Sequence, residues 1–459
     1  MRVAYYSPLP PMRSGIADYS AELLPQLANH LEIELIADDP HRVVPELADR
    51  FPLHAARELP TLAAQGRFDL LLYQLGNSAD FHGRIYETLL EHPGVVVLHE
   101  FVLHHLVRSL TLDRGDAAGY LEALRYAYGR SGLALGRRCL ATGIPLDVWS
   151  YPLFERAVDA GLGTIVHNET TRRRVLRSRP LARVATIPHH LSLAGLPSDL
   201  SPAAARASLG LPGGAFLIAS FGFITPVKRL EVTLRAFARF RREFPDSLYL
   251  LVGDASPYYD LDAVLKPGLR EGVVRLGHTR LEQFLRTMVA VDVALNLRYP
   301  SAGETSGTLI RLLGLGKPVV VSDDGSFAEI PAGCCAKVPL DETEEEVLLG
   351  YLRRLAADEP LRREMGENAR RHVAAHHTLE GSARRYAEFL QQVAAAAPAP
   401  FRPVPPLAPY PPEDVLTELV ADLAAEASDL GIGEGEEDLL RGLAEELVDL
   451  DLDRAGKGS

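Results

Sequence analysis

A glutamate and several small polar residues open a helical pattern within the stretch SAGETSGTLIRLLGLGKPVVVSDDGSFAEIP, residues 301–331. Glu304 lies in a glycine-rich loop, and the expected helix start carries Thr305, Ser306 and Gly307. Free amides at a helix N-terminus can bind a phosphate, while a carboxylate in the loop can bind sugar hydroxyls. We expect Glu329, which follows the next strand, to lie beside this loop. The alternative for Glu304 is an ordinary acidic residue at a helix N-terminus.

A pair of basic residues marks the segment FGFITPVKRL, which we interpret as strand, loop and helix. Lys228 and Arg229 lie at the expected helix start. Cations close to a helix N-terminus are unfavourable unless an anion lies between them. A diphosphate would be such an anion, whereas a solvated basic pair is the simpler alternative.

Two further candidates follow strands in the first half of the chain. Gly15 ends the loop Ser7–Gly15, where the backbone can approach a ligand at the start of a helix. His99 comes directly after the run VVVL, where an imidazole can donate to a bound hydroxyl or share its proton. A plain turn and a satisfied histidine are the respective alternatives.

Short apolar runs alternate with helical patterns along the chain, which predicts parallel sheets covered on both faces. The expected strands of the first half are Arg2–Tyr6, Ile33–Ile36, Leu70–Tyr73, Val95–Leu98 and Thr164–Val166. A second series comprises FLIASFGF, LYLLVGD, VVRLGH, DVALNL and KPVVVSD. Such sheets bind ligands at the carboxyl ends of their strands, so a cleft between two of them would gather all four candidate stretches. The loop after the first strand lacks a GxGxxG pattern, which disfavours a dinucleotide-dependent oxidoreductase.

The length of 459 residues exceeds that of one ordinary core and indicates two domains with accessory segments. We predict an N-terminal Rossmann-like domain over 1–191, with a helical insertion at about 104–161, and a second such domain over 192–381. Residues 382–397 read as a terminal helix packing back on the N-terminal domain, 398–412 as a Pro-rich linker and 413–459 as an acidic helical tail.

The charge and the cysteine content of the chain argue against several classes of protein. The net charge of −13 comes mainly from residues 413–459, which hold 15 acidic and 3 basic residues, so the near-neutral body gives no signal for nucleic acid. Three cysteines without metal-ligand spacing suggest neither a disulfide framework nor a metal site. We find no run of about 18 uncharged apolar residues and no secretory leader, and we expect a cytoplasmic protein.

These pieces, in their order and spacing, resemble retaining glycosyltransferases of family 4, which have the GT-B fold. The resemblance covers roughly residues 1–395 and is most specific over 216–331, through Gly222, Lys228, LYLLVGD, the GETSG loop, GKPVVVS and GSFAEIP. It implies a nucleotide-activated sugar in an interdomain cleft, moved with retention of anomeric configuration, without a metal or other cofactor.

The resemblance also implies roles for individual residues. Gly15, Gly222 and Lys228 would meet the diphosphate, with Arg229 beside them. Glu304 would contact the transferred sugar, and His99 a sugar hydroxyl near the reacting centre. The sequence departs from the family pattern at two places. Phe223 stands where the family usually has an arginine, and the position of the family's second glutamate, near residues 311 and 312, holds Arg311 or Leu312 instead.

Several alternatives and partners follow from this reading. A non-enzymatic nucleotide-sugar-binding or assembly subunit of the same fold would explain the departures, and a GT-B phosphorylase or epimerase is a third option. The sequence does not identify the acceptor; the resemblance implies a sugar, a lipid-linked glycan or a polysaccharide, which suggests polysaccharide biosynthesis. Helices within 104–161 could contact the inner membrane surface peripherally, and the acidic tail could bind a protein partner.

Overall fold

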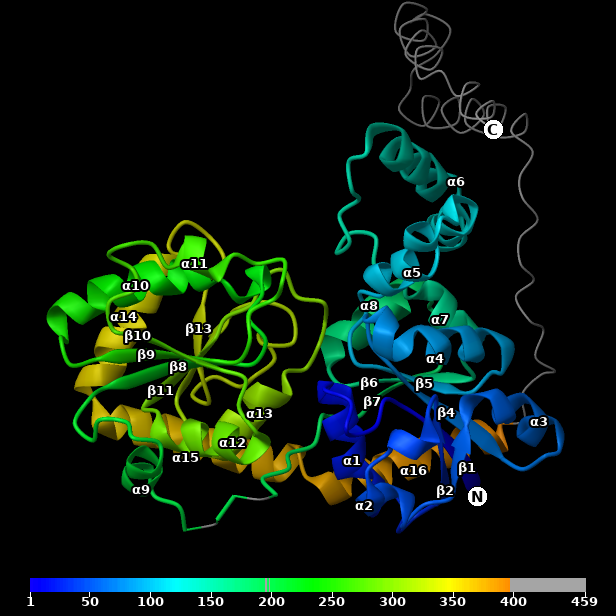
Figure 1. Ribbon diagram of the computed structural model, residues 1–459, viewed down its shortest axis with the longest axis horizontal. Coiled ribbons are helices and arrows are strands. Elements are labelled where there is room, and N and C mark those ends of the chain that lie inside the picture. Colours follow the sequence, from blue (N-terminus) through cyan, green and yellow to red (C-terminus); the bar gives the residue numbers. More distant parts are fainter. Residues whose placement is uncertain (195, 198, 397–459) are drawn as a thin grey trace, which may run out of the picture. The chain divides into compact units, whose positions relative to one another are not determined.

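The computed structural model describes residues 1–194, 196–197 and 199–396. Two parallel sheets carry the fold, with helices on both faces of each (Figure 1). The expected linker 398–412 and acidic tail 413–459 lie outside the described residues. No helix within the described part of the chain is both long and apolar enough to cross a membrane.

The first sheet has seven strands in the order β3-β2-β1-β4-β5-β6-β7. Its strands are β1 (Arg2–Tyr6), β2 (Glu32–Ala37), β3 (Leu53–Ala55), β4 (Leu70–Leu75), β5 (Val95–Leu98), β6 (Gly163–Val166) and β7 (Val184–Thr186). The helical segments around it are α1 (Gly15–Leu27), η1 (Pro40–Arg42), α2 (Pro45–Ala48), η2 (Ala56–Glu58), α3 (Leu59–Ala64), α4 (Ala79–Glu91), α5 (His104–Leu110), η3 (Leu112–Arg114), α7 (Glu155–Ala160) and α8 (Glu169–Ser178). All residues of β4 and β5 are buried, as parallel strands covered on both faces require.

The second sheet has six strands in the order β10-β9-β8-β11-β12-β13. Its strands are β8 (Leu217–Phe221), β9 (Leu248–Val252), β10 (Val273–Gly277), β11 (Val293–Asn296), β12 (Val319–Ser322) and β13 (Ala336–Val338). Its helical segments are α9 (Pro202–Ser208), η4 (Pro226–Lys228), α10 (Leu230–Glu243), α11 (Leu261–Val264), α12 (Leu281–Ala290), α13 (Gly307–Gly314), α14 (Glu344–Ala357) and α15 (Glu359–His376).

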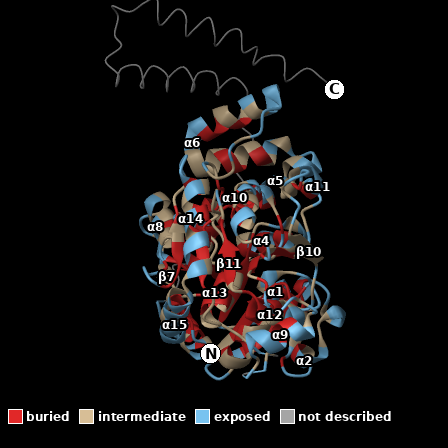
Figure 2. Cartoon of the chain, turned by 90° about the vertical axis from the view of Figure 1, so that its left-hand side faces the viewer, coloured by how far each residue is buried: buried red, intermediate tan, exposed pale blue. Residues whose placement is uncertain are grey.

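The core of the second sheet lies on both of its faces. Along β8, Leu217 and Ala219 belong to one apolar cluster and Ile218 to the other, because successive side chains of a strand point to opposite faces. Figure 2 shows these central strands as buried, while the outward faces of the surrounding helices are exposed. The sheet is therefore a rigid base for the loops at its carboxyl edge.

The last described helix, α16 (Leu379–Ala395), packs against the first sheet and not the second. The helix runs beside α1 (Figure 1) and shares an apolar core with it. The hydroxyls of Tyr386 and Tyr19 lie 2.8 Å apart. Both tyrosines are buried, so this contact ties the end of the described chain to the first domain.

Residues Ala117–Leu146 belong to a compact unit separate from the other described residues. This unit contains α6 (Ala117–Thr142), which is interrupted at Gly129 with φ 65° and ψ −146°. Residues 104–161, predicted as a helical insertion, contain α5, η3, α6 and α7.

Candidate active site

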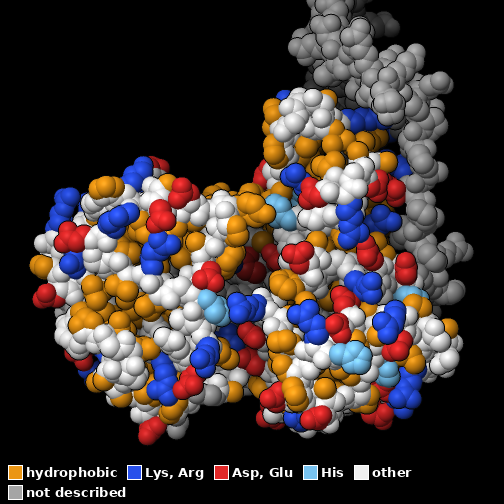
Figure 3. Space-filling view, in the orientation of Figure 1, with side chains coloured by type: hydrophobic (Ala, Val, Ile, Leu, Met, Phe, Trp, Pro, Cys, Tyr) orange, Lys and Arg blue, Asp and Glu red, His pale blue; other side chains and the backbone are white. Residues whose placement is uncertain are grey.

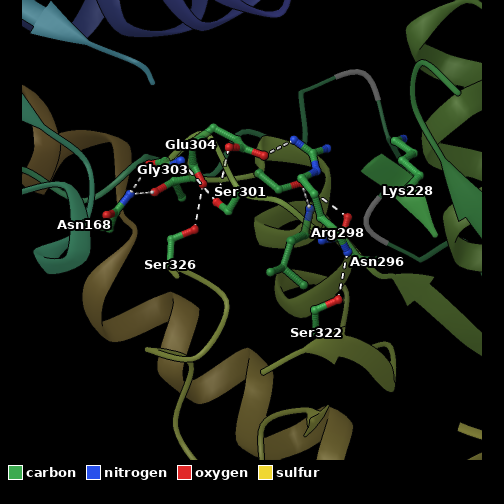
Figure 4. A network of polar contacts seen from close by, with 12 residues as sticks. Asn168, Lys228, Asn296, Arg298, Ser301, Gly303, Glu304, Ser322 and Ser326 are labelled. Carbon is green, nitrogen blue, oxygen red and sulfur yellow. Dashed lines mark hydrogen bonds and ion pairs between the residues drawn. The ribbon is translucent and has the colours of Figure 1, made fainter. Parts of the chain in front are cut away.

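Glu304 lies in the loop between β11 and α13, at the carboxyl edge of the second sheet (Figure 4). Its carboxylate pairs with the guanidinium of Arg298 and accepts a weaker bond from Ser301 Oγ at 3.4 Å. The backbone of the loop is held as well, because Ser326 Oγ donates to the Glu304 carbonyl at 2.6 Å. The carboxylate is therefore fixed before any ligand binds.

The same loop is bonded to the first domain. Asn168, at the start of α8, donates from Nδ2 to the Gly303 carbonyl at 2.8 Å and to Thr305 Oγ1 at 3.0 Å (Figure 4). The Phe101 amide donates to the Ala302 carbonyl at 2.8 Å. Gly303 has φ +79°, and a Cβ there would lie 2.2 Å from the Phe101 ring. Only glycine fits this close approach, which explains the glycine before Glu304.

Lys228 ends η4 and points its ammonium at the carboxyl end of β8. Nζ donates to the Phe221 carbonyl, and a Cβ on Gly222, at φ +84°, would lie 3.2 Å from it. Among the described residues, no carboxylate lies within ion-pairing distance of this ammonium. Burial, reinforced by the charge of Arg298, lowers the pKa of Lys228 to about 7, although Glu304 opposes the shift. An anion arriving here would stabilise the charged lysine.

His99 follows β5 at the carboxyl edge of the first sheet. Its Nε2 lies 2.8 Å from the Gln74 side-chain oxygen. Burial, together with His167 and His189, holds the pKa of His99 well below its usual range, so the ring is neutral. A neutral ring that donates from Nε2 keeps its lone pair on Nδ1, and can therefore accept a proton or a hydrogen bond there.

Four histidines surround the ring of Tyr19. One is His99, and the other three, His167, His189 and His190, were not candidates from the sequence. The Tyr19 ring centroid lies 4.9 Å from that of His99, 5.3 Å from His167, 4.9 Å from His189 and 4.3 Å from His190. Burial is the main cause that lowers the pKa of all four histidines, so the cluster is uncharged. The available sequence signals were His99 itself and the histidine pair in IPHH, residues 187–190, which directly follows a short strand.

An ion pair links α1 to α13 beside this cluster. Arg311 Nη2 lies 2.7 Å from Glu22, whose other carboxylate oxygen lies 3.2 Å from His190 Nε2. Leu312, the next residue, is fully buried in the second core. Neither residue provides a carboxylate at the place where the second glutamate was expected.

The helix starts named from the sequence are present. Gly15 begins α1, which Ser14 caps by accepting from the Ile16 amide at 3.3 Å. Gly307 begins α13, which Ser306 caps by accepting from the Leu309 amide at 3.2 Å. The Thr305 hydroxyl, in contrast, is engaged by Asn168.

The structure gives Arg229 and Glu329 contacts other than those expected. The Arg229 guanidinium pairs with Glu344 at the start of α14, with Nε 3.0 Å from the carboxylate. The Glu329 carboxylate accepts from the Glu169 amide at 3.0 Å and from the Thr170 amide and hydroxyl at 2.5 and 2.6 Å, so it caps α8 of the first domain. Arg229 is thus ion-paired and Glu329 hydrogen-bonded within the protein, and a contact of either residue with the ligand stays a prediction.

Glu100, adjacent to His99, is a further residue that the sequence analysis did not name. Its Oε1 accepts from the Asn77 amide at 2.9 Å. Burial, together with the negative charge of Glu304, raises the pKa of Glu100 to about 7. Figure 3 shows a hollow between the two sheet domains with acidic side chains in its deeper part. The sequence signal was a carboxylate following a strand-end histidine.

A cavity of about 290 Å³ lies at the carboxyl ends of β8, β9 and β10. Its lining residues are Ile224, Leu251, Gly253, Asp254, Ala255, Leu261, Arg275, Leu276 and Gly277. The amide of Gly222 donates to the Val252 carbonyl at 2.8 Å, so the cavity adjoins the strand end that carries Lys228. Within the described ranges, no group of three histidine, cysteine or acidic side chains is arranged to hold a metal ion.

Solved structures with this architecture identify the fold. Sucrose-phosphate synthase from Thermosynechococcus elongatus superposes with a TM-score of 0.63 at 17% identity, over 86% of this chain and 100% of that one. HepE from Anabaena in complex with UDP gives 0.60 at 15% identity, over 85% and 100%. The fold is GT-B. The predicted fold class, with two Rossmann-like domains, is thereby confirmed for the described residues.

Sequence comparisons of this GT-B chain support a group 1 glycosyltransferase. Residues 203–372 match the family model described as glycosyl transferases group 1. The chain is 28% identical over 207 residues to D-inositol 3-phosphate glycosyltransferase of Stackebrandtia nassauensis, covering 41% of this chain and 45% of that protein. The match to the Nocardia farcinica protein of the same name is 29% over 200 residues, covering 41% and 44%. The matched part thus spans less than half the length of these relatives.

Proposed function

We propose that this protein is a retaining glycosyltransferase that moves a hexose from a nucleoside diphosphate sugar to an acceptor hydroxyl without requiring a metal. The observation that carries the proposal is Lys228, a half-buried cation without a carboxylate partner among the described residues, which lies next to Gly222 and interacts electrostatically with Arg298 and Glu304. The two cationic side chains, Lys228 and Arg298, outnumber the single carboxylate of Glu304, and this excess of positive charge favours binding of a diphosphate.

The donor fits the second domain in three parts. The cavity at the ends of β8 to β10 takes the nucleoside, with Asp254 and Arg275 as polar groups on its wall. The diphosphate then lies by Lys228 and the N-terminus of α13, where free amides favour an anion. The sugar lies at Glu304, whose carboxylate accepts from its hydroxyls. The HepE structures, which are titled as complexes with UDP and UDP-glucose, support a nucleotide sugar for this fold.

Catalysis consists of stabilising the charge that separates when the bond from the sugar to the diphosphate breaks. The transition state has oxocarbenium character, as in glycoside hydrolysis. Lys228 and the helix N-termini at Gly15 and Gly307 stabilise the growing negative charge on the leaving diphosphate. The acceptor oxygen attacks the face that the diphosphate leaves, which retains the anomeric configuration, and its proton passes to the departing phosphate.

His99, which belongs to the first domain, contacts the sugar from the side opposite the donor-binding second domain. The neutral imidazole, with its lone pair on Nδ1, accepts a hydrogen bond from a sugar hydroxyl and does not repel the oxocarbenium ion. Gln74 fixes this tautomer through its side-chain oxygen.

A nucleotide-sugar-binding subunit with little turnover is the second candidate. It is favoured by Leu312, which is buried where the family has its second glutamate, and by the exposed Phe223 in place of an arginine. The discriminating experiment is a panel of nucleotide sugars screened by thermal shift, followed by turnover of the best binder with and without EDTA. Binding with turnover that resists EDTA supports the metal-independent transferase, whereas binding without turnover supports the subunit.

A further inference from the structure

A second cavity, of about 460 Å³, lies in the first domain at the carboxyl ends of β1 and β2, next to α4. The lining residues are Tyr6, Ser7, Pro8, Leu9, Pro11, Met12, Arg13, Ala37, Asp38, Asp39, Arg42, Val43, Phe81 and Ile85. It shares none of them with the cavity assigned to the nucleoside. Its volume falls in the range of small-molecule sites.

The walls of this cavity are largely carbon. Leu9, Ala37 and Ile85 are buried, Phe81 is half-buried, and Met12 is exposed at the rim. A ligand with only polar groups would leave these surfaces uncovered, so the occupant has an apolar portion.

The charged side chains at the rim of this cavity differ in whether other groups of the protein bind them. Asp38 accepts from the Tyr6 hydroxyl and lies 3.9 Å from Arg84, and Asp39 accepts from the His41 amide at 3.2 Å. In contrast, the guanidinium groups of Arg13 and Arg42 make no hydrogen bond or ion pair with the described residues. The two charged groups at the rim that lack a partner among the described residues are therefore guanidinium groups, and they come from the loop before α1 and from η1.

The loop Ser7–Gly15 connects this cavity to the candidate active site. Its residues 7–9 and 11–13 contribute to the lining, and Gly15 begins α1, whose N-terminus is assigned to the diphosphate. A ligand held in the cavity is thus bound by the same loop that borders the site of transfer.

We propose that this cavity is the acceptor subsite and that it takes an acceptor in which a phosphate group is joined to an apolar portion. Arg13 and Arg42 hold the phosphate, and the apolar walls bind the remainder. The assignment as an acceptor subsite rests on the proposed function, whereas the binding of such a molecule does not.

Octyl phosphate, used below its micelle concentration, tests the binding by calorimetry on the full chain. We expect it to bind more tightly than both inorganic phosphate and octyl glucoside, because only octyl phosphate supplies both parts. Arg42→Met should weaken its binding about tenfold through loss of a charge-assisted contact. Phe81→Ala should weaken octyl phosphate binding but leave inorganic phosphate unchanged. The matched control is Arg57→Met, which removes an exposed arginine that does not line the cavity.

Equal affinity for octyl phosphate and octyl glucoside would overturn the anionic class of ligand. An affinity for octyl phosphate that is unchanged in Arg42→Met and Phe81→Ala would overturn the location. Hydrolysis of the nucleotide sugar in the absence of acceptor, measured in the same variants, should stay at the wild-type rate, because neither residue contacts the donor. Failure of the wild type to bind any donor would refute the proposed function, and a loss of donor hydrolysis in Arg42→Met would refute the role as an acceptor subsite.

Discussion

Replacing Lys228 by alanine removes the cation that we assign to the leaving diphosphate. The ammonium donates to the backbone carbonyl of Phe221 and has a lowered pKa of about 7, so it contributes little to stability in the empty protein. Loss of one such contact to a developing charge typically costs about 3 kcal/mol, or roughly a hundredfold in turnover. We expect this loss in kcat with an unchanged melting temperature.

The pH dependence of donor binding gives the same residue a second signature. Only the protonated lysine attracts the diphosphate, so this contribution is fully present below pH 7 and is lost as the pH rises through 7. With a pKa of about 7, the protonated fraction falls from about one half at pH 7 to about one tenth at pH 8, which weakens UDP binding about fivefold. Lys228→Arg stays charged and should remove this part of the pH dependence.

Isothermal titration with UDP at pH 6 to 8.5, together with donor turnover, measures both effects. The matched control is Lys337→Ala, because Lys337 also donates from its ammonium to a backbone carbonyl, that of Ala328 at 2.6 Å. A turnover in Lys228→Ala equal to that of the control, or a pH profile identical in Lys228→Arg and the wild type, would refute the assignment of Lys228 to the diphosphate.

Three further substitutions test other contacts of the site. Glu304→Gln should weaken binding of the intact nucleotide sugar about tenfold while leaving UDP affinity nearly unchanged, since the carboxylate is assigned to sugar hydroxyls; an equal loss for both ligands would show that Glu304 instead shapes its loop. Glu100→Gln removes a carboxyl whose pKa is raised to about 7, mainly by burial and also by Glu304. The change in activity that this group causes near pH 7 should therefore disappear. An unaltered pH profile would show that Glu100 does not affect the reaction. Asn168→Ala breaks two hydrogen bonds to the Glu304 loop and should lower turnover about tenfold with a small loss of stability; wild-type turnover with a lower melting temperature would limit Asn168 to a structural role.

The fold followed from the sequence where burial leaves a clear pattern. The runs at Leu70–Tyr73 and Val95–Leu98 are apolar at every position because both faces of the sheet are covered. The strands β3, β7 and β13 were not expected, because each has three residues at a sheet edge or next to it, too few for a periodic pattern.

Residues at the carboxyl ends of strands could be named in advance because the topology of parallel sheets brings those ends together. This applies to His99, Lys228 and Glu304. The partners of Arg229 and Glu329 could not be read from the sequence, because Glu344 and Thr170 lie 115 and 159 positions away along the chain. A charged side chain next to a binding loop can find its partners in the protein as readily as in a ligand.

The central claim is that the region between Lys228 and Glu304 binds a nucleotide sugar and breaks its glycosidic phosphate bond. The most direct measurement is release of nucleoside diphosphate from a panel of nucleotide sugars that includes UDP-glucose, with the anomer of the released or transferred sugar followed by proton NMR. We predict release from at least one donor by the wild type and first appearance of the anomer present in the donor. Release should fall roughly a hundredfold in Lys228→Ala and about tenfold in Glu304→Gln at subsaturating donor. Release at the wild-type rate in both variants, or an inverted first product, would contradict the account.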